Sequence, residues 1–219
     1  MNSMKLKAMP LFWAAILAGA SYMLVVTNGW SGPLFTAWKG LGVGLLALWA
    51  AANAQSRDGW LIALVMALGA AGDVLLDAMG LEVGGTVFAL GHMVAFWLYF
   101  RNRRAALTGS QKLLGLLTVP LAVFAAWRLP GATEGALHAA LYTLFVAAMA
   151  ATAWISRFPR YRTGIGAMMF LASDLFIFSR YGLLKGSLLP TLMVWPLYFG
   201  GQALIVWGVV TTLRADSRD

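Results

Sequence analysis

Residues 60–79 read WLIALVMALGAAGDVLLDAM, a run of twenty residues whose charged side chains are Asp73 and Asp77. A helix needs about 20 predominantly apolar residues to cross roughly 30 Å of hydrocarbon, so this run predicts a membrane-spanning helix. The whole chain shares this character, because 61% of its 219 residues are apolar and 11% are charged. Soluble domains carry about 25% charged residues. The composition therefore excludes a soluble globular domain.

Similar apolar runs, bounded by charges, Gly and Pro, follow one another along the chain. We expect a single integral membrane domain over residues 1–219, folded as an all-α bundle of about eight transmembrane helices. The expected spans are 10–27, 34–54, 60–79, 85–100, 111–128, 136–155, 164–182 and 189–213. The first run follows Lys5 and Lys7 as in a signal peptide, but no cleavage site leads into a polar domain, so we expect a retained span.

Basic residues outnumber acidic ones by 16 to 8 and are scattered between the apolar runs. With the N-terminus in the cytoplasm, twelve of the sixteen fall on the cytoplasmic side, and the other four are Lys39, Arg128, Arg180 and Lys185. This positive-inside bias predicts a multi-pass protein with both termini in the cytoplasm, and we expect a bacterial inner membrane as its host. Scattered charges do not predict nucleic-acid binding. The absence of cysteine excludes disulfides and thiol chemistry.

Two of the expected spans share a short sequence echo. Residues 71–76, AGDVLL, match residues 172–177, ASDLFI, and both spans run in the same direction through the membrane. A four-plus-four parallel repeat would explain the match and would bring Asp73 and Asp174 to a shared centre.

Ionisable side chains inside a membrane span cost a few kcal/mol each and are functional candidates by default. From their distances to the span ends, we expect Lys39, Asp73, Asp77, His92 and Asp174 to share one depth band. In a functional pocket, Lys39 offsets the carboxylate charge, His92 donates to a carboxylate, and one carboxyl group stays protonated while another is ionised. The alternative is a structural polar network between helices, and near the interface Lys39 and Asp77 could also snorkel.

Two further polar pairs stand one helical turn apart. Tyr198 and Gln202 share a face of the last span, where they could bind a headgroup or a leaving oxygen, or simply join helices. His138 and Tyr142 form a similar pair, which we expect at the membrane interface. The two histidines are 46 residues apart and make no zinc motif, so we expect no metal site. Nucleotide-binding and serine-hydrolase motifs are also missing from the sequence.

In their order and spacing, these motifs resemble the YhhN family of eight-span membrane proteins. The residues that carry the resemblance are Lys39, Gly72-Asp73-Val74-Leu75-Leu76, Phe88-x-x-Gly91-His92, Ser173-Asp174 and Tyr198-x-x-x-Gln202. Two positions depart from the family pattern: Gly40 stands where the family often has Pro, and Ala95 stands where a Tyr often follows the His. The second change removes a possible hydroxyl group from the pocket.

The resemblance implies a lysoplasmalogenase, which hydrolyses the vinyl ether of a lysoplasmalogen to a fatty aldehyde and a glycerophospho-base. It implies Asp73 and Asp174 as the catalytic pair. It also implies a set of residues that tune this pair or hold the phosphate-bearing headgroup: Lys39, Asp77, His92, Tyr198 and Gln202. Vinyl ether cleavage needs an acid, a nearby negative charge and one water, so no cofactor is expected. The expected partners are a lysophospholipid substrate, membrane lipid and water, without an obligate protein partner.

Other functions fit the same residues. Buried carboxyl groups and a parallel repeat also describe a proton-coupled transporter or lipid carrier. A related hydrolase acting on another ether or ester lipid is a further alternative, and a structural membrane subunit is disfavoured by the short loops. Release of product in detergent, where transport cannot occur, separates hydrolysis from transport.

Overall fold

The computed structural model describes residues 6–131 and 135–217, and every regular element in these ranges is helical. Lys5 and Arg218, two of the basic residues expected on the cytoplasmic side, lie outside the described residues. The elements are α1 (Met9–Ser21), α2 (Met23–Asn28), α3 (Pro33–Asn53), α4 (Arg57–Met79), α5 (Leu81–Arg101), α6 (Gly109–Arg128), α7 (Gly135–Ile155), the π-helical turn η1 (Arg160–Gly164), α8 (Ile165–Ser179) and α9 (Leu189–Asp216).

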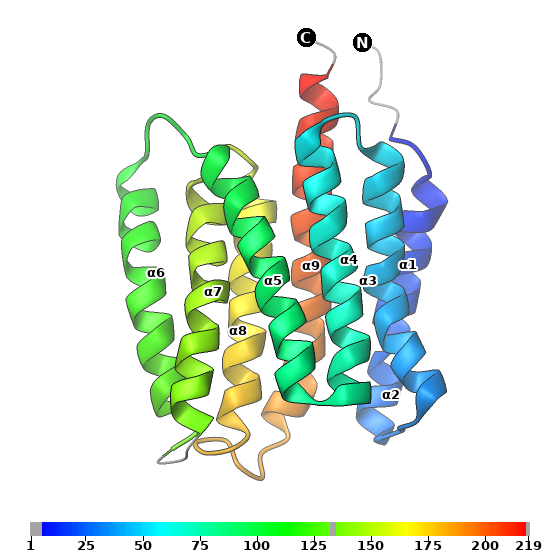
Figure 1. Ribbon diagram of the computed structural model, residues 1–219, viewed down its shortest axis with the longest axis vertical. Coiled ribbons are helices and arrows are strands. Elements are labelled where there is room, and N and C mark those ends of the chain that lie inside the picture. The colour runs from blue at the N-terminus through cyan, green and yellow to red at the C-terminus, as the bar shows by residue number, and fades with distance from the viewer. Residues whose placement is uncertain (1–5, 132–134, 218–219) are drawn as a thin grey trace.

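The helices stand side by side in one bundle, with α6 at one edge and α1 and α2 at the other (Figure 1). Within the described ranges, seven helical segments are long and apolar enough to cross a membrane, counting α1 and α2 as one segment. The remaining helix, α8, has 15 residues, and η1 precedes it directly. Because α1 begins and α9 ends at the same end of the bundle, the chain crosses it an even number of times. The predicted all-α membrane bundle is confirmed, and the chain is an integral multi-pass membrane protein.

The first expected span, residues 10–27, is not one continuous helix. It breaks at Tyr22, between α1 and α2. The indole Nε1 of Trp195 donates to the backbone oxygen of Gly19 at 2.7 Å, and that oxygen would otherwise accept from the amide of Met23. Since a side chain enters the backbone ladder at this point, the helix kinks. The indole comes from the last helix, so the break could not be predicted locally.

The expected span 164–182 also differs from the structure. Its regular helix ends at Ser179, and residues 180–185 form hydrogen-bonded turns instead. The helical path begins earlier than expected, because the π-helical turn starts at Arg160, directly after Pro159. The fixed φ of proline suits the residue that precedes a helical turn. The crossing is therefore shifted by a few residues toward the N-terminus of the segment.

The outer surface of the bundle is apolar, and its interior is closely packed. Leu17, Leu116 and Phe124 are among the large side chains that remain exposed, which is what lipid contact requires. Inside, α8 and α9 approach so closely that a Cβ atom on Gly166 would lie 2.6 Å from the backbone oxygen of Gly201. Small residues at helix contacts permit this approach in membranes.

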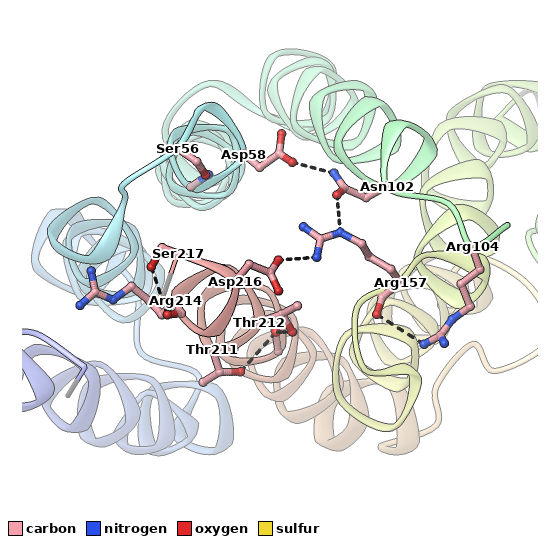
Figure 2. A network of polar contacts seen from close by, with 12 residues as sticks. Ser56, Asp58, Asn102, Arg104, Arg157, Thr211, Thr212, Arg214, Asp216 and Ser217 are labelled. Carbon is pink, nitrogen blue, oxygen red and sulfur yellow. Dashed lines mark hydrogen bonds and ion pairs between the residues drawn. The ribbon is translucent and has the colours of Figure 1, made fainter. Parts of the chain in front are cut away.

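A polar network closes the end of the bundle where α1 begins and α9 ends (Figure 2). Arg157 donates from Nε to Asn102 Oδ1 at 2.7 Å and also pairs with Asp216. Asn102 Nδ2 in turn donates to Asp58 Oδ2 at 2.8 Å. Arg104 donates to backbone oxygens just after α7. The network joins α4, α5, α7 and α9, so several basic residues that the sequence assigned only to the positive-inside bias also tie helices together.

Candidate active site in the bundle core

Asp73 lies in the interior, on the face of α4 that packs against α9. Its residue is 2% exposed, and its Oδ2 accepts a hydrogen bond from the hydroxyl of Tyr198 at 2.7 Å. Gln202, one turn further along α9, is equally buried, and its amide lies beside the same hydroxyl. Gly69 makes room for both, because a Cβ atom there would lie 2.9 Å from Gln202 Nε2. The predicted pair on α9 therefore holds a carboxyl group in place.

Asp174, on α8, is likewise buried and also accepts a hydrogen bond from a tyrosine. Its residue is 6% exposed, and its Oδ2 accepts from the hydroxyl of Tyr142, on α7, at 3.2 Å. The same hydroxyl lies 3.1 Å from Nε2 of His92, on α5. His92 is 4% exposed. Three helices thus contribute one hydrogen-bonded chain, His92–Tyr142–Asp174.

A cluster of aromatic rings stands between the two carboxyl groups. The ring of Phe170, on α8, packs edge-on against Tyr198 at 5.0 Å and against His92 at 4.9 Å between centroids. Phe88, on α5, contacts Phe170 and Tyr198 in the same manner at 6.1 and 5.8 Å. These rings help to bury the two carboxyl groups, which are 2% and 6% exposed, and keep bulk water from them.

A small cavity adjoins this cluster. About 20 Å³ of it is open to the centre of a water-sized sphere, which is room for about one water molecule. Phe88, Phe170, His92 and Gln202 line it, so both polar clusters reach its wall. Ala95 also lines it, at the position where the family often has Tyr. The cavity has room for a water molecule but none for a lipid chain.

Lys39 and Asp77 lie apart from the buried groups, toward the opposite end of the bundle from the polar network. Lys39 Nζ and Asp77 Oδ1 are 2.6 Å apart, and their side chains are 14% and 32% exposed. Asp77 follows Asp73 by one helical turn, about 6 Å along the axis of α4. The predicted depth band therefore divides into three buried groups and one accessible ion pair.

Two expectations about this region are wrong. His92 was expected to donate to a carboxylate, but its described hydrogen bond is to the hydroxyl of Tyr142, which stands between them. Tyr142 was expected at the interface with His138, yet only His138 is exposed. Counted from the starts of the expected spans 85–100 and 136–155, His92 and Tyr142 both lie about 10 Å deep on the same side of the membrane, so a comparison of expected depths would have suggested this contact.

Within residues 6–131 and 135–217, no three His, Cys, Asp or Glu side chains come together in a group suited to hold a metal ion. The polar groups that the core brings together around the cavity are carboxyl groups, tyrosine hydroxyls, one imidazole and the Gln202 amide. Such a set can give, accept and hold protons, and an ionised carboxylate in it can stabilise a positive charge.

This architecture defines a class: a polytopic helical membrane protein whose core holds two tyrosine-bonded carboxyl groups beside a water-sized cavity. The YhhN family model matches residues 34–209, from the start of α3 to within α9, and so includes both carboxyl groups. The chain belongs to the YhhN family. Comparison with curated proteins gave no significant match. Comparison with solved structures likewise gave none.

Proposed function

We propose that this protein is a lysoplasmalogenase, a membrane-embedded hydrolase of the vinyl ether bond. The observation that carries the proposal is the pairing of Asp73 with Tyr198 and of Asp174 with Tyr142. Gln202 and His92, which adjoin these pairs, line a cavity with room for one water. Cleavage of this bond requires an acid, a negative charge and a water, and the core provides a place for each.

The reaction begins when a carboxylic acid donates its proton to the β-carbon of the vinyl ether. This leaves a positive charge shared by the α-carbon and the ether oxygen, which a nearby ionised carboxylate stabilises. Water then adds to the α-carbon and loses a proton, forming a hemiacetal. When the hemiacetal collapses, its hydroxyl loses a proton, the carbon–oxygen bond to glycerol breaks, and the glycerol oxygen gains a proton. The products are a fatty aldehyde and a glycerophospho-base.

The headgroup of the substrate matches the accessible ion pair. Lys39 carries the charge that a phosphate needs, and Asp77 carries the charge that a headgroup ammonium needs. Because Asp77 lies one helical turn from Asp73, a headgroup bound by this ion pair would lie near the end of the bundle while the vinyl ether reaches the core. Since the cavity has room for one water, the alkenyl chain would have to displace apolar side chains on entry.

The test is product release by the purified protein in detergent. We expect fatty aldehyde from a lysoplasmalogen and no fatty acid from the acyl lysophospholipid of the same headgroup, both measured by mass spectrometry. Asp73→Asn and Asp174→Asn should each abolish aldehyde release without loss of folded protein. Glu82→Gln, which neutralises an exposed carboxylate in the first turn of α5, is the matched control and should keep full activity.

Each alternative gives a different result. Fatty acid from the acyl lipid would identify a relative that acts on esters. If neither lipid yields product, the hydrolase proposal fails and a proton-coupled transporter or lipid carrier becomes the better reading of the buried carboxyl groups. Activity of the purified chain alone would also show that no protein partner is required.

We also propose that both termini face the cytoplasm of a bacterial host. Arg57, Arg101, Arg157 and Arg214 lie at the end of the bundle where α1 begins, and positive charge favours that side. Alkaline phosphatase fused to the C-terminus should then be inactive in intact cells, whereas a cytoplasmic fluorescent protein should fluoresce there. The reverse pattern would overturn the orientation.

A further inference from the structure

The two carboxyl groups differ in what lies behind their tyrosines. The polar group next to the Tyr198 hydroxyl that donates to Asp73 is the Gln202 amide. An amide group can donate and accept hydrogen bonds, but it does not take up a proton near neutral pH. On the Tyr198 side of Asp73, Gln202 therefore cannot take up a proton and pass it to the carboxyl group.

Behind Asp174 the chain ends in an imidazole instead. Tyr142 lies 3.2 Å from Asp174 Oδ2 and 3.1 Å from His92 Nε2. Imidazole can take up a proton near neutral pH and release it to a hydrogen-bonded neighbour. His92 also lines the cavity that has room for a water. A continuous path of polar groups thus runs from the cavity through the tyrosine to one of the two carboxyl groups.

The Tyr142 hydroxyl has one hydrogen and two partners, so the chain has two hydrogen-bonded forms. When Asp174 is ionised, the tyrosine donates to it and accepts from His92 Nε2–H. When Asp174 is protonated, its own O–H donates to the tyrosine, which then donates to an unprotonated Nε2. Both forms keep the Tyr142 hydroxyl bonded to both of its partners. When His92 is protonated at both ring nitrogens, shifting one hydrogen along each bond converts the first form into the second.

We propose that His92 and Tyr142 return a proton to Asp174 after each turnover, so that Asp174 is the acid of the reaction and Asp73 is its ionised stabilising group. This rests on the proposed function. Asp174 gives its proton to the β-carbon and becomes ionised. Tyr142 then turns its hydroxyl hydrogen to the ionised Asp174. The water that attacks the α-carbon gives a proton to the bare Nε2 of His92, while Nδ1 keeps its own hydrogen. That Nε2 proton passes to Tyr142 as Tyr142 passes its own to Asp174. The proton balance closes within the core.

Tyr142 and His92 act through Asp174. If they relay a proton, they are needed only after Asp174 has lost its own; if they only position Asp174, they are needed in every turnover. A freshly prepared enzyme already holds the proton on Asp174, so its first turnover does not use the relay. Later turnovers do. Removing the relay should therefore spare the first aldehyde released per enzyme and slow all that follow, whereas misplacing Asp174 should slow every turnover equally.

The experiment is rapid-quench measurement of aldehyde with lysoplasmalogen in excess over purified full-length protein. The variants are Tyr142→Phe and His92→Gln. Glutamine places an amide near the position of Nε2, so it can still hydrogen-bond with the tyrosine but cannot pass a proton. Tyr181→Phe and His138→Gln make the same changes at exposed positions and serve as matched controls.

We expect both core variants to release about one aldehyde per enzyme at the wild-type rate. Their steady-state kcat should then fall by about 100-fold, the lower end of what a positioned proton-transfer group contributes, with KM unchanged. The controls should match the wild type. Either core variant suffices if the other does not purify as folded protein.

Two results would overturn the relay while leaving the hydrolase intact. One is a first turnover slowed as much as the steady state, which would mean that the residues only position Asp174. The other is a His92→Gln steady-state rate equal to wild type, which would mean that the imidazole carries no proton. If the wild-type protein releases no aldehyde, the proposed function itself fails, and the relay fails with it.

Discussion

Removal of the Tyr198 hydroxyl tests the role of Asp73 directly. The hydroxyl donates to Asp73 Oδ2 at 2.7 Å. The ring packs edge-on against Phe170, at 5.0 Å between centroids, and at a tilt against Trp195, at 5.5 Å. Tyr198→Phe keeps the ring and its contacts and removes one hydrogen bond. Any change in rate therefore reports on the carboxylate that lost its donor.

The expected magnitude follows from the charge on the acceptor. A hydrogen bond to an ionised group contributes about 1.5–3 kcal/mol, and its loss leaves that much less stabilisation for the ionised, correctly placed carboxylate. At about 1.4 kcal/mol per factor of ten, kcat should fall by about 10- to 150-fold. KM should stay within about a factor of three, because the hydroxyl is buried and lies a helical turn from the ion pair proposed to hold the headgroup.

The assay is steady-state aldehyde release in detergent, with Tyr181→Phe as the control for loss of an exposed hydroxyl. Thermal unfolding of each variant shows whether the fold is kept. A folded Tyr198→Phe protein with kcat within a factor of two of wild type would refute the reasoning, because Asp73 could not then depend on its only described tyrosine partner. A large rise in KM at constant kcat would move Tyr198 to substrate binding.

Three further predictions concern packing, the headgroup and the polar end of the bundle. Gly166→Val should lower the stability of the bundle by about 1–3 kcal/mol, since its Cβ would lie 2.6 Å from the backbone oxygen of Gly201, and an unchanged unfolding temperature in detergent would contradict this. Lys39→Met should raise KM for a lysoplasmalogen about tenfold or more through the lost phosphate contact, and the prediction fails if KM is unchanged. Asn102→Ala removes three side-chain hydrogen bonds and should cost about 3 kcal/mol of stability with little effect on KM, as thermal unfolding and steady-state kinetics together would reveal.

Most of the fold could be predicted because lipid imposes a simple rule. A segment of about 20 apolar residues must satisfy its own backbone, and only a helix does so. The expected spans over residues 34–54, 60–79 and 136–155 agree with α3, α4 and α7 to within three residues at each end. The break at Tyr22 was missed because its cause, the indole of Trp195, comes from the far end of the chain.

Most residues of the candidate site could also be predicted, because the apolar membrane makes ionisable side chains conspicuous. Asp73, His92 and Asp174 stand out because ionisable groups are costly in apolar spans. Tyr142 does not stand out, because tyrosine is common at membrane interfaces and its hydroxyl is cheap to place there. Its role follows from the packing of α5, α7 and α8, which brings His92, Tyr142 and Asp174 into contact.

The sequence by itself therefore determined that this is a multi-pass helical membrane protein and to which family it is similar. It also determined which ionisable side chains cost free energy to place inside the membrane. Hydrophobicity and charge are properties of single residues, and they can be read without knowing any contact. Only the tertiary structure decided the partners: Tyr198 for Asp73, Tyr142 and His92 for Asp174, and Asp77 for Lys39. These partners depend on how each helix is rotated and packed. Close contacts between residues that are distant in the sequence determine that packing.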